Sequence, residues 1–161
     1  DLDLYQVNCT FYDALGRRDN EHLIARAIQF FAPGIPQVYY VGLLAGVNDM
    51  DLLARSRVGR DINRHYYTPA EIGSSLQKPV VQKLLELMRL RNTHPAFAGH
   101  ADVDTQSDQT LVMTWNNAEH WARLFVDLSE PGALLTHSNL AAEQGTNTGA
   151  WDSRHESLLQ R

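Results

Sequence analysis

Residues 35–41 read Ile35-Pro36-Gln37-Val38-Tyr39-Tyr40-Val41, an apolar and aromatic run with almost no alternation. Such a run is typical of a strand covered on both faces, as in parallel sheets. It follows a helical pattern that ends at Ala32-Pro33-Gly34. A helix followed by a buried parallel strand predicts an α/β arrangement for this part of the chain.

Two amphipathic helices flank the predicted strand. In the first, Asp19 is expected to be the N-cap, and apolar residues recur at helical spacing up to Phe31. The second begins at Pro79 and has a wide apolar face that ends near Asn92.

The connection from Gly42 to the second helix is far longer than the about two to six residues usual in such units. It is expected to contain one short helix, because Thr68-Pro69-Ala70-Glu71 has the pattern of a capping box. Long connections at the carboxyl end of a parallel strand often carry binding groups in α/β enzymes. We therefore expect functional residues in this connection.

From Ala101 onward the hydrophobic period becomes alternating, which predicts an antiparallel β unit. Asn116-Asn117 and Glu130-Pro131-Gly132 are expected to form its turns. The predicted strands lie at residues 110–115, 120–126 and 133–137, with a closing strand near Trp151 and Leu158-Leu159.

One parallel strand with two helices leaves backbone hydrogen-bonding groups of that strand without partners. Residues 1–97 are therefore expected to be an incomplete α/β domain that packs against further polypeptide. Residues 98–161 are expected to form a separate antiparallel β domain. The start at Asp1, without a methionine, also suggests the interior of a longer chain.

The composition argues against several classes of protein. Lys and Arg total 14 against 19 Asp and Glu, a net charge of -5, so neither nucleic acid nor a membrane is an expected partner. The single cysteine, Cys9, cannot form an internal disulfide, which suggests a cytoplasmic protein. The 7 histidines are scattered singly, so no metal site is expected.

Two segments carry side chains suited to binding a sugar. Asp3-Leu4-Tyr5-Gln6 combines a carboxylate, a phenol and an amide, and residues 59–67 place the donors of Arg60 beside further polar groups. Each segment has a plainer explanation: a solvated loop for the first, and an Arg-Asp network that pins the long connection for the second. The residues alone leave both explanations open.

These two segments, with Asn48-Asp49 and the proline-rich run at residues 33–42, resemble sucrose phosphorylases of the α-amylase superfamily of glycoside hydrolases. Residues 4–8 and 59–65 carry the most specific part of the resemblance, which extends from Asp1 to about Phe97. Beyond that point the chain resembles the family only as a β-rich C-terminal domain of suitable size.

The resemblance implies that residues 1–97 are the last βα units of a (β/α)8 TIM barrel, followed by a small antiparallel β domain at residues 98–161. It implies conversion of sucrose and phosphate to α-glucose 1-phosphate and fructose, with retention, through a covalent glucosyl-enzyme. The catalytic carboxylates of the family lie earlier in the chain, so this fragment is expected to be inactive alone. No cofactor is implied, and the missing N-terminal part of the same chain is the expected partner.

The resemblance also implies roles for individual residues. Arg60 would hydrogen-bond the glucosyl unit, and Gln6 would lie at the acceptor site. Asp3, Leu4 and Tyr5 would lie on a loop that rearranges between the half-reactions, with the carboxylate toward fructose and the phenol toward phosphate. This fits the charges, because a carboxylate repels a phosphate dianion whereas a phenol can donate a hydrogen bond to it.

Two alternatives remain open at this point. A hydrolase, transglycosylase or phosphorylase of the same superfamily could act on another α-glucoside. A non-catalytic sugar-binding domain is a second alternative, because the catalytic carboxylates are absent from this chain.

Overall fold

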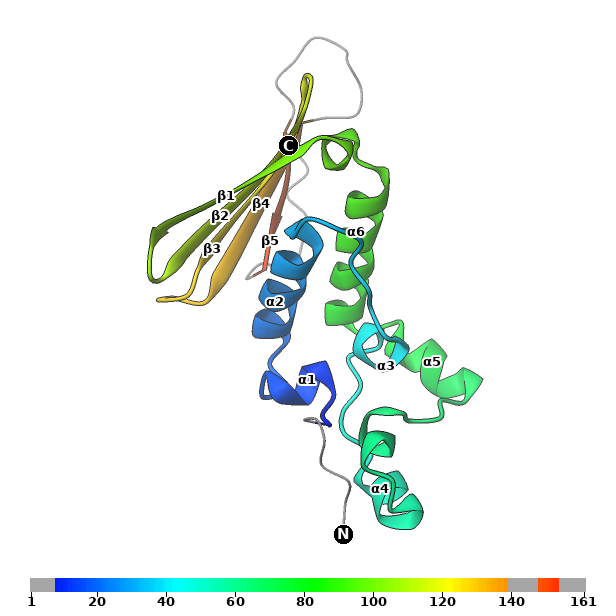
Figure 1. Cartoon of the computed structure of the whole chain (residues 1–161). Coiled ribbons are helices and arrows are strands. Elements are labelled where there is room, and N and C mark those ends of the chain that lie inside the picture. Colours follow the sequence, from blue (N-terminus) through cyan, green and yellow to red (C-terminus); the bar gives the residue numbers. More distant parts are fainter. Residues whose placement is uncertain (1–7, 139–147, 154–161) are drawn as a thin grey trace. The chain divides into compact units, whose positions relative to one another are not determined.

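The computed structural model describes residues 8–138 and 148–153 (Figure 1). Two compact units share these residues: parts of Asp1–His22 and Gln37–Leu84 form the first, and parts of Leu23–Pro36 and Leu85–Arg161 form the second. No helix in the described ranges is both long and apolar enough to cross a membrane. The helices are α1 (Phe11–Ala14), α2 (Asp19–Phe31), α3 (Tyr40–Leu43), α4 (Met50–Ser56), α5 (Pro69–Ser75) and α6 (Pro79–Thr93), with 3-10 helices η1 (Gly59–Asn63) and η2 (Pro95–Ala98).

The two long helices confirm the predictions made from helical spacing. Helix α2 covers Asp19–Phe31 and α6 covers Pro79–Thr93. The N-cap prediction is displaced by one residue, because Asp19 is the first residue of α2 rather than the residue before it. Its carboxylate accepts a hydrogen bond from the hydroxyl of Tyr12 at 2.6 Å.

The predicted strand at residues 35–41 is wrong for the chain as described. Residues 35–39 belong to no helix or strand, and α3 begins at Tyr40. The backbone at Tyr39 is extended, with φ -72° and ψ 145°, and the side chain of Ile35 is 94% exposed. Because a parallel strand is stabilised by ladders on both sides, local sequence alone cannot form it, and the described residues supply no neighbouring parallel strand. The (β/α)8 arrangement stays a prediction.

The long connection holds more structure than was predicted. Helix α5 has the expected capping box between Thr68 and Glu71. Helix α4 and the 3-10 helix η1 were not expected. Helix α4 begins after Asp49, whose carboxylate accepts a hydrogen bond from the backbone N–H of Leu52 at 2.7 Å, an N-cap that satisfies one of the free donors of the first turn.

The antiparallel β unit is confirmed. Its strands follow one another in the order β1-β2-β3-β4-β5, and all neighbouring pairs are antiparallel. The closing strand contains Trp151, as predicted, whereas Leu158-Leu159 lie outside the described residues. The strands are β1 (His100–Ser107), β2 (Thr110–Asn117), β3 (His120–Asp127), β4 (Gly132–Ser138) and β5 (Thr148–Asp152).

One turn differs from its prediction. Asn116 and Asn117 lie within β2, where Asn117 pairs with His120. The two-residue turn is therefore Ala118-Glu119, and Ala118 has a left-handed φ of 53°. The ladder continues two residues further than the sequence pattern indicated. The second turn covers residues 128–131 between β3 and β4, so it includes Glu130 and Pro131 as predicted, whereas Gly132 is the first residue of β4 and pairs with Asp127.

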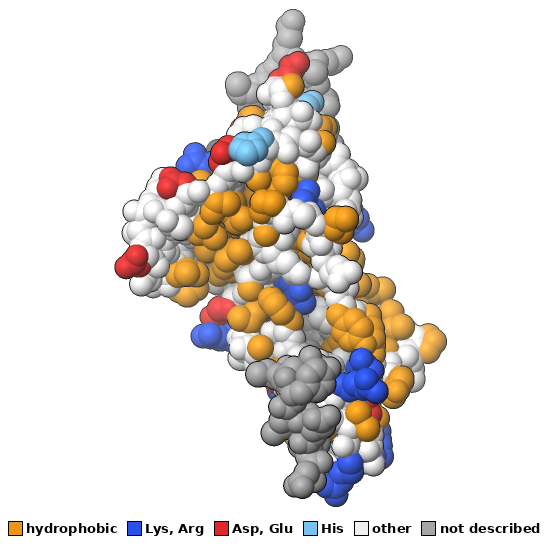
Figure 2. All heavy atoms as spheres, in the orientation of Figure 1, with side chains coloured by type: hydrophobic (Ala, Val, Ile, Leu, Met, Phe, Trp, Pro, Cys, Tyr) orange, Lys and Arg blue, Asp and Glu red, His pale blue; other side chains and the backbone are white. Residues whose placement is uncertain are grey.

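A row of apolar side chains crosses the sheet and forms its core. Met113, Leu124, Leu135 and Trp151 lie in register on β2 to β5, and all four are buried. Val103 continues the row onto the edge strand β1, where it is 56% exposed. Figure 2 shows hydrophobic side chains gathered on the visible side of this unit.

Aromatic rings and an arginine join helices of the second unit to its sheet. The guanidinium of Arg91 lies over the neighbouring rings of Phe97 and Trp115, 4.6 Å and 4.8 Å from their centres. It also donates a hydrogen bond to the carbonyl of Gly34 at 2.9 Å. The indole N–H of Trp115 donates to the carbonyl of Phe31 at 2.8 Å. These contacts tie the ends of α2 and α6 to β2.

Three of the histidines that are scattered in the sequence come together in the second unit. The ring of the buried His94 lies 5.0 Å from the ring of His137 and 6.1 Å from that of His120. The backbone carbonyl of Ser138 lies 2.7 Å from Nε2 of His94. Burial lowers the pKa of His94, and the two neighbouring imidazoles act in the same direction.

Candidate functional site

The predicted site residues differ in what the structure says of them. Asp3, Leu4, Tyr5 and Gln6 lie outside the described residues. Arg60 lies in η1 of the first unit, and its side chain is exposed. Its guanidinium is therefore accessible in this chain.

Hydrogen bonds join the segment that follows Gln6 to the long connection. The backbone N–H of Thr10 donates to Oδ1 of Asn48 at 2.7 Å. The side-chain amide of Asn63 donates to the carbonyl of Cys9 at 3.4 Å. Residues 9–10 therefore contact both the start of α4 and the end of η1, the element that carries Arg60.

Asp13 strengthens the same junction. One oxygen of its carboxylate accepts the backbone N–H of Asn48, and the other accepts Nε of Arg17 at 2.6 Å. Partial burial works to raise the pKa of Asp13, but these hydrogen bonds and the charge of Arg17 outweigh burial and hold the pKa below its usual value. The charged carboxylate is therefore the form that joins these segments.

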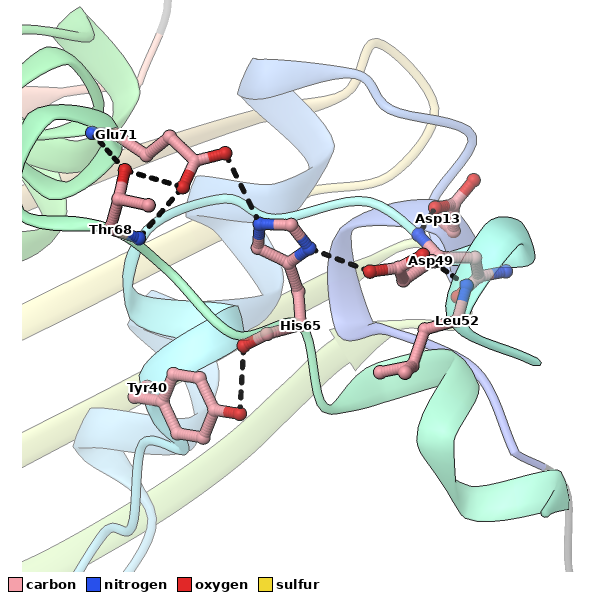
Figure 3. A network of polar contacts seen from close by, with 8 residues as sticks. Asp13, Tyr40, Asp49, Leu52, His65, Thr68 and Glu71 are labelled. Atoms are coloured by element: carbon pink, nitrogen blue, oxygen red, sulfur yellow. Dashed lines mark hydrogen bonds and ion pairs between the residues drawn. The ribbon is translucent and has the colours of Figure 1, made fainter. Parts of the chain in front are cut away.

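Asp49, His65 and Glu71 form a chain of charged side chains beside this junction (Figure 3). Nδ1 of His65 lies 2.6 Å from Oδ2 of Asp49, and Nε2 lies 3.4 Å from Oε1 of Glu71. The hydroxyl of Tyr40 donates to the carbonyl of His65 at 3.0 Å, which fixes the backbone at this point.

This geometry favours the imidazolium form of His65. Each ring nitrogen faces a carboxylate oxygen, which can only accept, so both nitrogens are needed as donors. The hydrogen bond to Asp49 raises the pKa of His65, and the same bond lowers the pKa of Asp49. The pKa of Glu71 is also lowered, mainly by the backbone N–H of Thr68.

A cleft of about 640 Å³ lies next to these side chains in the first unit. The polar side chains among its lining residues could form hydrogen bonds with a ligand that carries many hydroxyl groups. In the part of the chain that the structure describes, no three His, Cys, Asp or Glu side chains are placed to hold a metal ion. The cleft is lined by Asp49, Asp51, His65, Tyr67, Glu71, Ser74, Ser75 and Lys78, with residues 45–48, Met50 and Ala70.

Sequence spacing does not indicate that Asp49, His65 and Glu71 lie together. His65 belongs to the polar segment at residues 59–67, whereas the sequence pattern predicts only a capping box for Glu71, and Asp49 enters only through the resemblance. Glu71 performs both tasks, since Oε2 accepts from the backbone of Thr68 at 2.7 Å while Oε1 faces His65. The signal that could have suggested Asp49 is its N-cap position ahead of α4.

Comparison with known proteins gives the chain its relatives. The chain is 60% identical over 137 residues to sucrose phosphorylase from Agrobacterium vitis. This match covers 85% of this chain and 28% of that protein. Over 137 residues it is 50% identical to glucosylglycerol phosphorylase from Marinobacter adhaerens, covering 85% of this chain and 28% of that protein. No protein-family model matches.

Solved structures give the same result. The crystal structure of sucrose 6F-phosphate phosphorylase from Thermoanaerobacter thermosaccharolyticum matches with a TM-score of 0.83 and 46% identity, over 87% of this chain and 28% of that one. The matched region is the C-terminal part of that protein. A cyclic α-maltosyl-(1→6)-maltose hydrolase from Arthrobacter globiformis shares the fold alone, with a TM-score of 0.61 and 13% identity over 90% of this chain and 33% of that one.

The chain thus spans little more than a quarter of the length of these relatives. Within that span the identity to a sucrose phosphorylase is 60%, and the structural match is with the C-terminal part of a phosphorylase. The resemblance seen in the sequence is confirmed: this chain is similar to the C-terminal part of sucrose phosphorylases and of related phosphorylases.

Proposed function

We propose that the complete protein is a retaining sucrose phosphorylase, which converts sucrose and phosphate to α-glucose 1-phosphate and fructose. The observation that carries this proposal is the 60% identity to the Agrobacterium vitis sucrose phosphorylase. The reaction runs through a covalent glucosyl-enzyme, so the same glucosyl site serves both half-reactions. The catalytic carboxylates belong to polypeptide outside this chain, and the fragment binds rather than reacts.

Arg60 is the glucosyl-binding residue of this proposal. Its guanidinium is exposed on η1, and its fixed fork of donors suits sugar hydroxyls held beside a carboxylate. Because the glucosyl unit is present in both half-reactions, loss of Arg60 should slow both.

The loop at Asp3, Leu4, Tyr5 and Gln6 supplies acceptor and phosphate contacts in this proposal. The contact between Cys9 and Asn63 supports it, because Cys9 follows Gln6 by three residues and Asn63 follows Arg60 by three residues. Three residues span at most about 11 Å, so chain connectivity alone limits how far the backbone at Gln6 and at Arg60 can lie from this contact.

A second candidate is a phosphorylase of the same kind with a different acceptor. The 50% identity to glucosylglycerol phosphorylase and the 46% identity to a sucrose 6(F)-phosphate phosphorylase favour it over a hydrolase. In such an enzyme the glucosyl site would be retained and the acceptor loop at residues 3–6 would differ in its choice of partner.

The test uses the complete protein in both directions. With sucrose and inorganic phosphate it should release glucose 1-phosphate, and no glucose 1-phosphate should form when phosphate is left out. With glucose 1-phosphate as donor, fructose should be preferred over fructose 6-phosphate, glycerol and glycerate. Preference for one of the last three supports the second candidate, and free glucose as the main product overturns both.

The partners in this proposal are sucrose, phosphate, fructose and glucose 1-phosphate, together with the N-terminal part of the same protein. The cytoplasmic location and the division into domains at residue 97 stay predictions from the sequence.

A further inference from the structure

Residues 49–65 form a closed loop whose two ends meet at Asp49. The backbone N–H of Asp49 donates to the carbonyl of Ile62 at 2.7 Å, and its carboxylate lies 2.6 Å from the imidazole of His65. Between these ends the chain forms α4 and then η1, which carries Arg60. We call these two contacts of Asp49, with Ile62 and with His65, the neck of the loop. Arg60 lies within the loop that the neck closes.

We propose that His65 is a positioning residue: its bridge between Asp49 and Glu71 closes the neck of the loop at residues 49–65 and thereby places Arg60 for glucosyl binding. This inference rests on the proposed function, since it concerns the residue assigned to the glucosyl unit. His65 itself touches no substrate in this account.

The bridge also anchors the loop to the rest of the first unit. Glu71 belongs to α5, so its contact with His65 joins the neck to a separate helix. The carbonyl of His65 accepts from Tyr40 at the start of α3. The loop neck is thus held from two sides, and removal of the imidazole would free it from both carboxylates at once.

The charges around His65 fit a bridge that needs its proton. Asp49 precedes α4, and Glu71 lies on α5. The ring of Tyr67 packs edge-on with its centre 4.5 Å from that of His65. Asp51 and Lys78 line the same cleft. Since both ring nitrogens face acceptors, deprotonation removes one donor and sets a lone pair against a carboxylate.

A double-mutant cycle in the complete protein tests whether His65 acts through Arg60. His65→Gln should lower kcat/KM for sucrose phosphorolysis on the order of 10-fold to 100-fold, as expected for a misplaced binding group. In an Arg60→Lys background, which keeps the positive charge but not the fork of donors, the same change should have little further effect on the remaining kcat/KM. Full multiplication of the two losses overturns the inference.

His100→Gln is the matched control. His100 also contacts a carboxylate, Asp102 at 3.3 Å, but on the exposed edge strand of the other unit. It should leave kcat/KM unchanged in both backgrounds. In addition, the fall of wild-type kcat/KM above neutral pH should be weaker in His65→Gln and unaltered in His100→Gln. An unaltered alkaline limb in His65→Gln contradicts the bridge.

Trypsin separates this inference from the proposed function. The loop carries the exposed residues Arg55, Arg57, Arg60 and Arg64, so an open neck should be cut there, and mass spectrometry of the fragments locates the cuts. At one fixed pH, His65→Gln should be cut in this loop several-fold faster than the wild type and His100→Gln at the wild-type rate. Equal rates for wild type and His65→Gln overturn the bridge of His65 between Asp49 and Glu71. Absence of phosphorolysis by the wild type overturns only the proposed function.

Discussion

Nδ1 of His65 lies 2.6 Å from Oδ2 of Asp49, and this pair closes the loop at residues 49–65 that carries Arg60. The pair joins residues 16 positions apart, and Glu71 extends it to a neighbouring helix. A charged contact thus determines where an exposed arginine is presented.

The bridge predicts how stability changes with pH. The folded-state pKa of His65 is raised by Asp49, so its contribution is fully present below about pH 6.5 and is lost as the pH rises through the raised value. The contribution should be on the order of 1 kcal/mol, because the side chain is about a third exposed. Urea unfolding of the complete wild type and His65→Gln should therefore differ more at pH 6 than at pH 9. A difference that is the same at both pH values would contradict this assignment.

For His94, in the second unit, we expect the opposite dependence of stability on pH. Burial lowers its folded-state pKa, so the unfolded chain takes up the proton first and stability is lost as the pH falls below about 6.5. Thermal unfolding followed from pH 7.5 to pH 5.5 should show a smaller decrease in Tm for His94→Asn than for the wild type. His100→Gln, at an exposed site, should follow the wild type; a parallel decrease in all three proteins would remove His94 as the cause.

Replacing Arg91, a single residue of α6, should lower the free energy of unfolding by a large amount. Arg91→Ala removes the stacking on Phe97 and Trp115 and the hydrogen bond to Gly34, and should lower the free energy of unfolding by about 2 to 4 kcal/mol. Arg89→Ala, two positions earlier on an exposed face of α6, is the control and should cost less than about 0.5 kcal/mol. Equal costs for the two variants in urea unfolding would show that the stacking contributes nothing.

Substitution of Gln6 should change which acceptor the complete protein prefers. In the complete protein, Gln6→Ala should alter the preference among fructose, glycerol and phosphate several-fold more than it alters formation of the glucosyl-enzyme. Single-turnover release of fructose measures the first step, and product analysis with competing acceptors measures the second. An equal loss in both steps would contradict an acceptor-site role.

Local patterns were sufficient for the helices and the β meander. The spacing up to Phe31, the proline at residue 79 and the alternation from Ala101 each depend on neighbours in the sequence. They fail at residues 35–41, because a parallel strand depends on partners that are distant in the chain. The Asn116-Asn117 turn was wrong for a related reason: the register of β2 against β3 extends the ladder past it.

The candidate site was predictable in its residue types and not in its contacts. Arg60 and His65 stand in a segment whose polar content was evident, but the pairing of His65 with Asp49 arises only when α4 and η1 fold back on each other. The grouping of His94, His120 and His137 is likewise a product of strand register and of the end of α6. Sequence spacing gives no sign of such groupings.

The most direct measurement is glucose 1-phosphate formation by the complete protein from sucrose and phosphate, for the wild type and for Arg60→Ala. The account predicts phosphate-dependent product with the wild type and a severe loss in both half-reactions with Arg60→Ala. Near-normal turnover by Arg60→Ala, or no glucose 1-phosphate from the wild type, would contradict it.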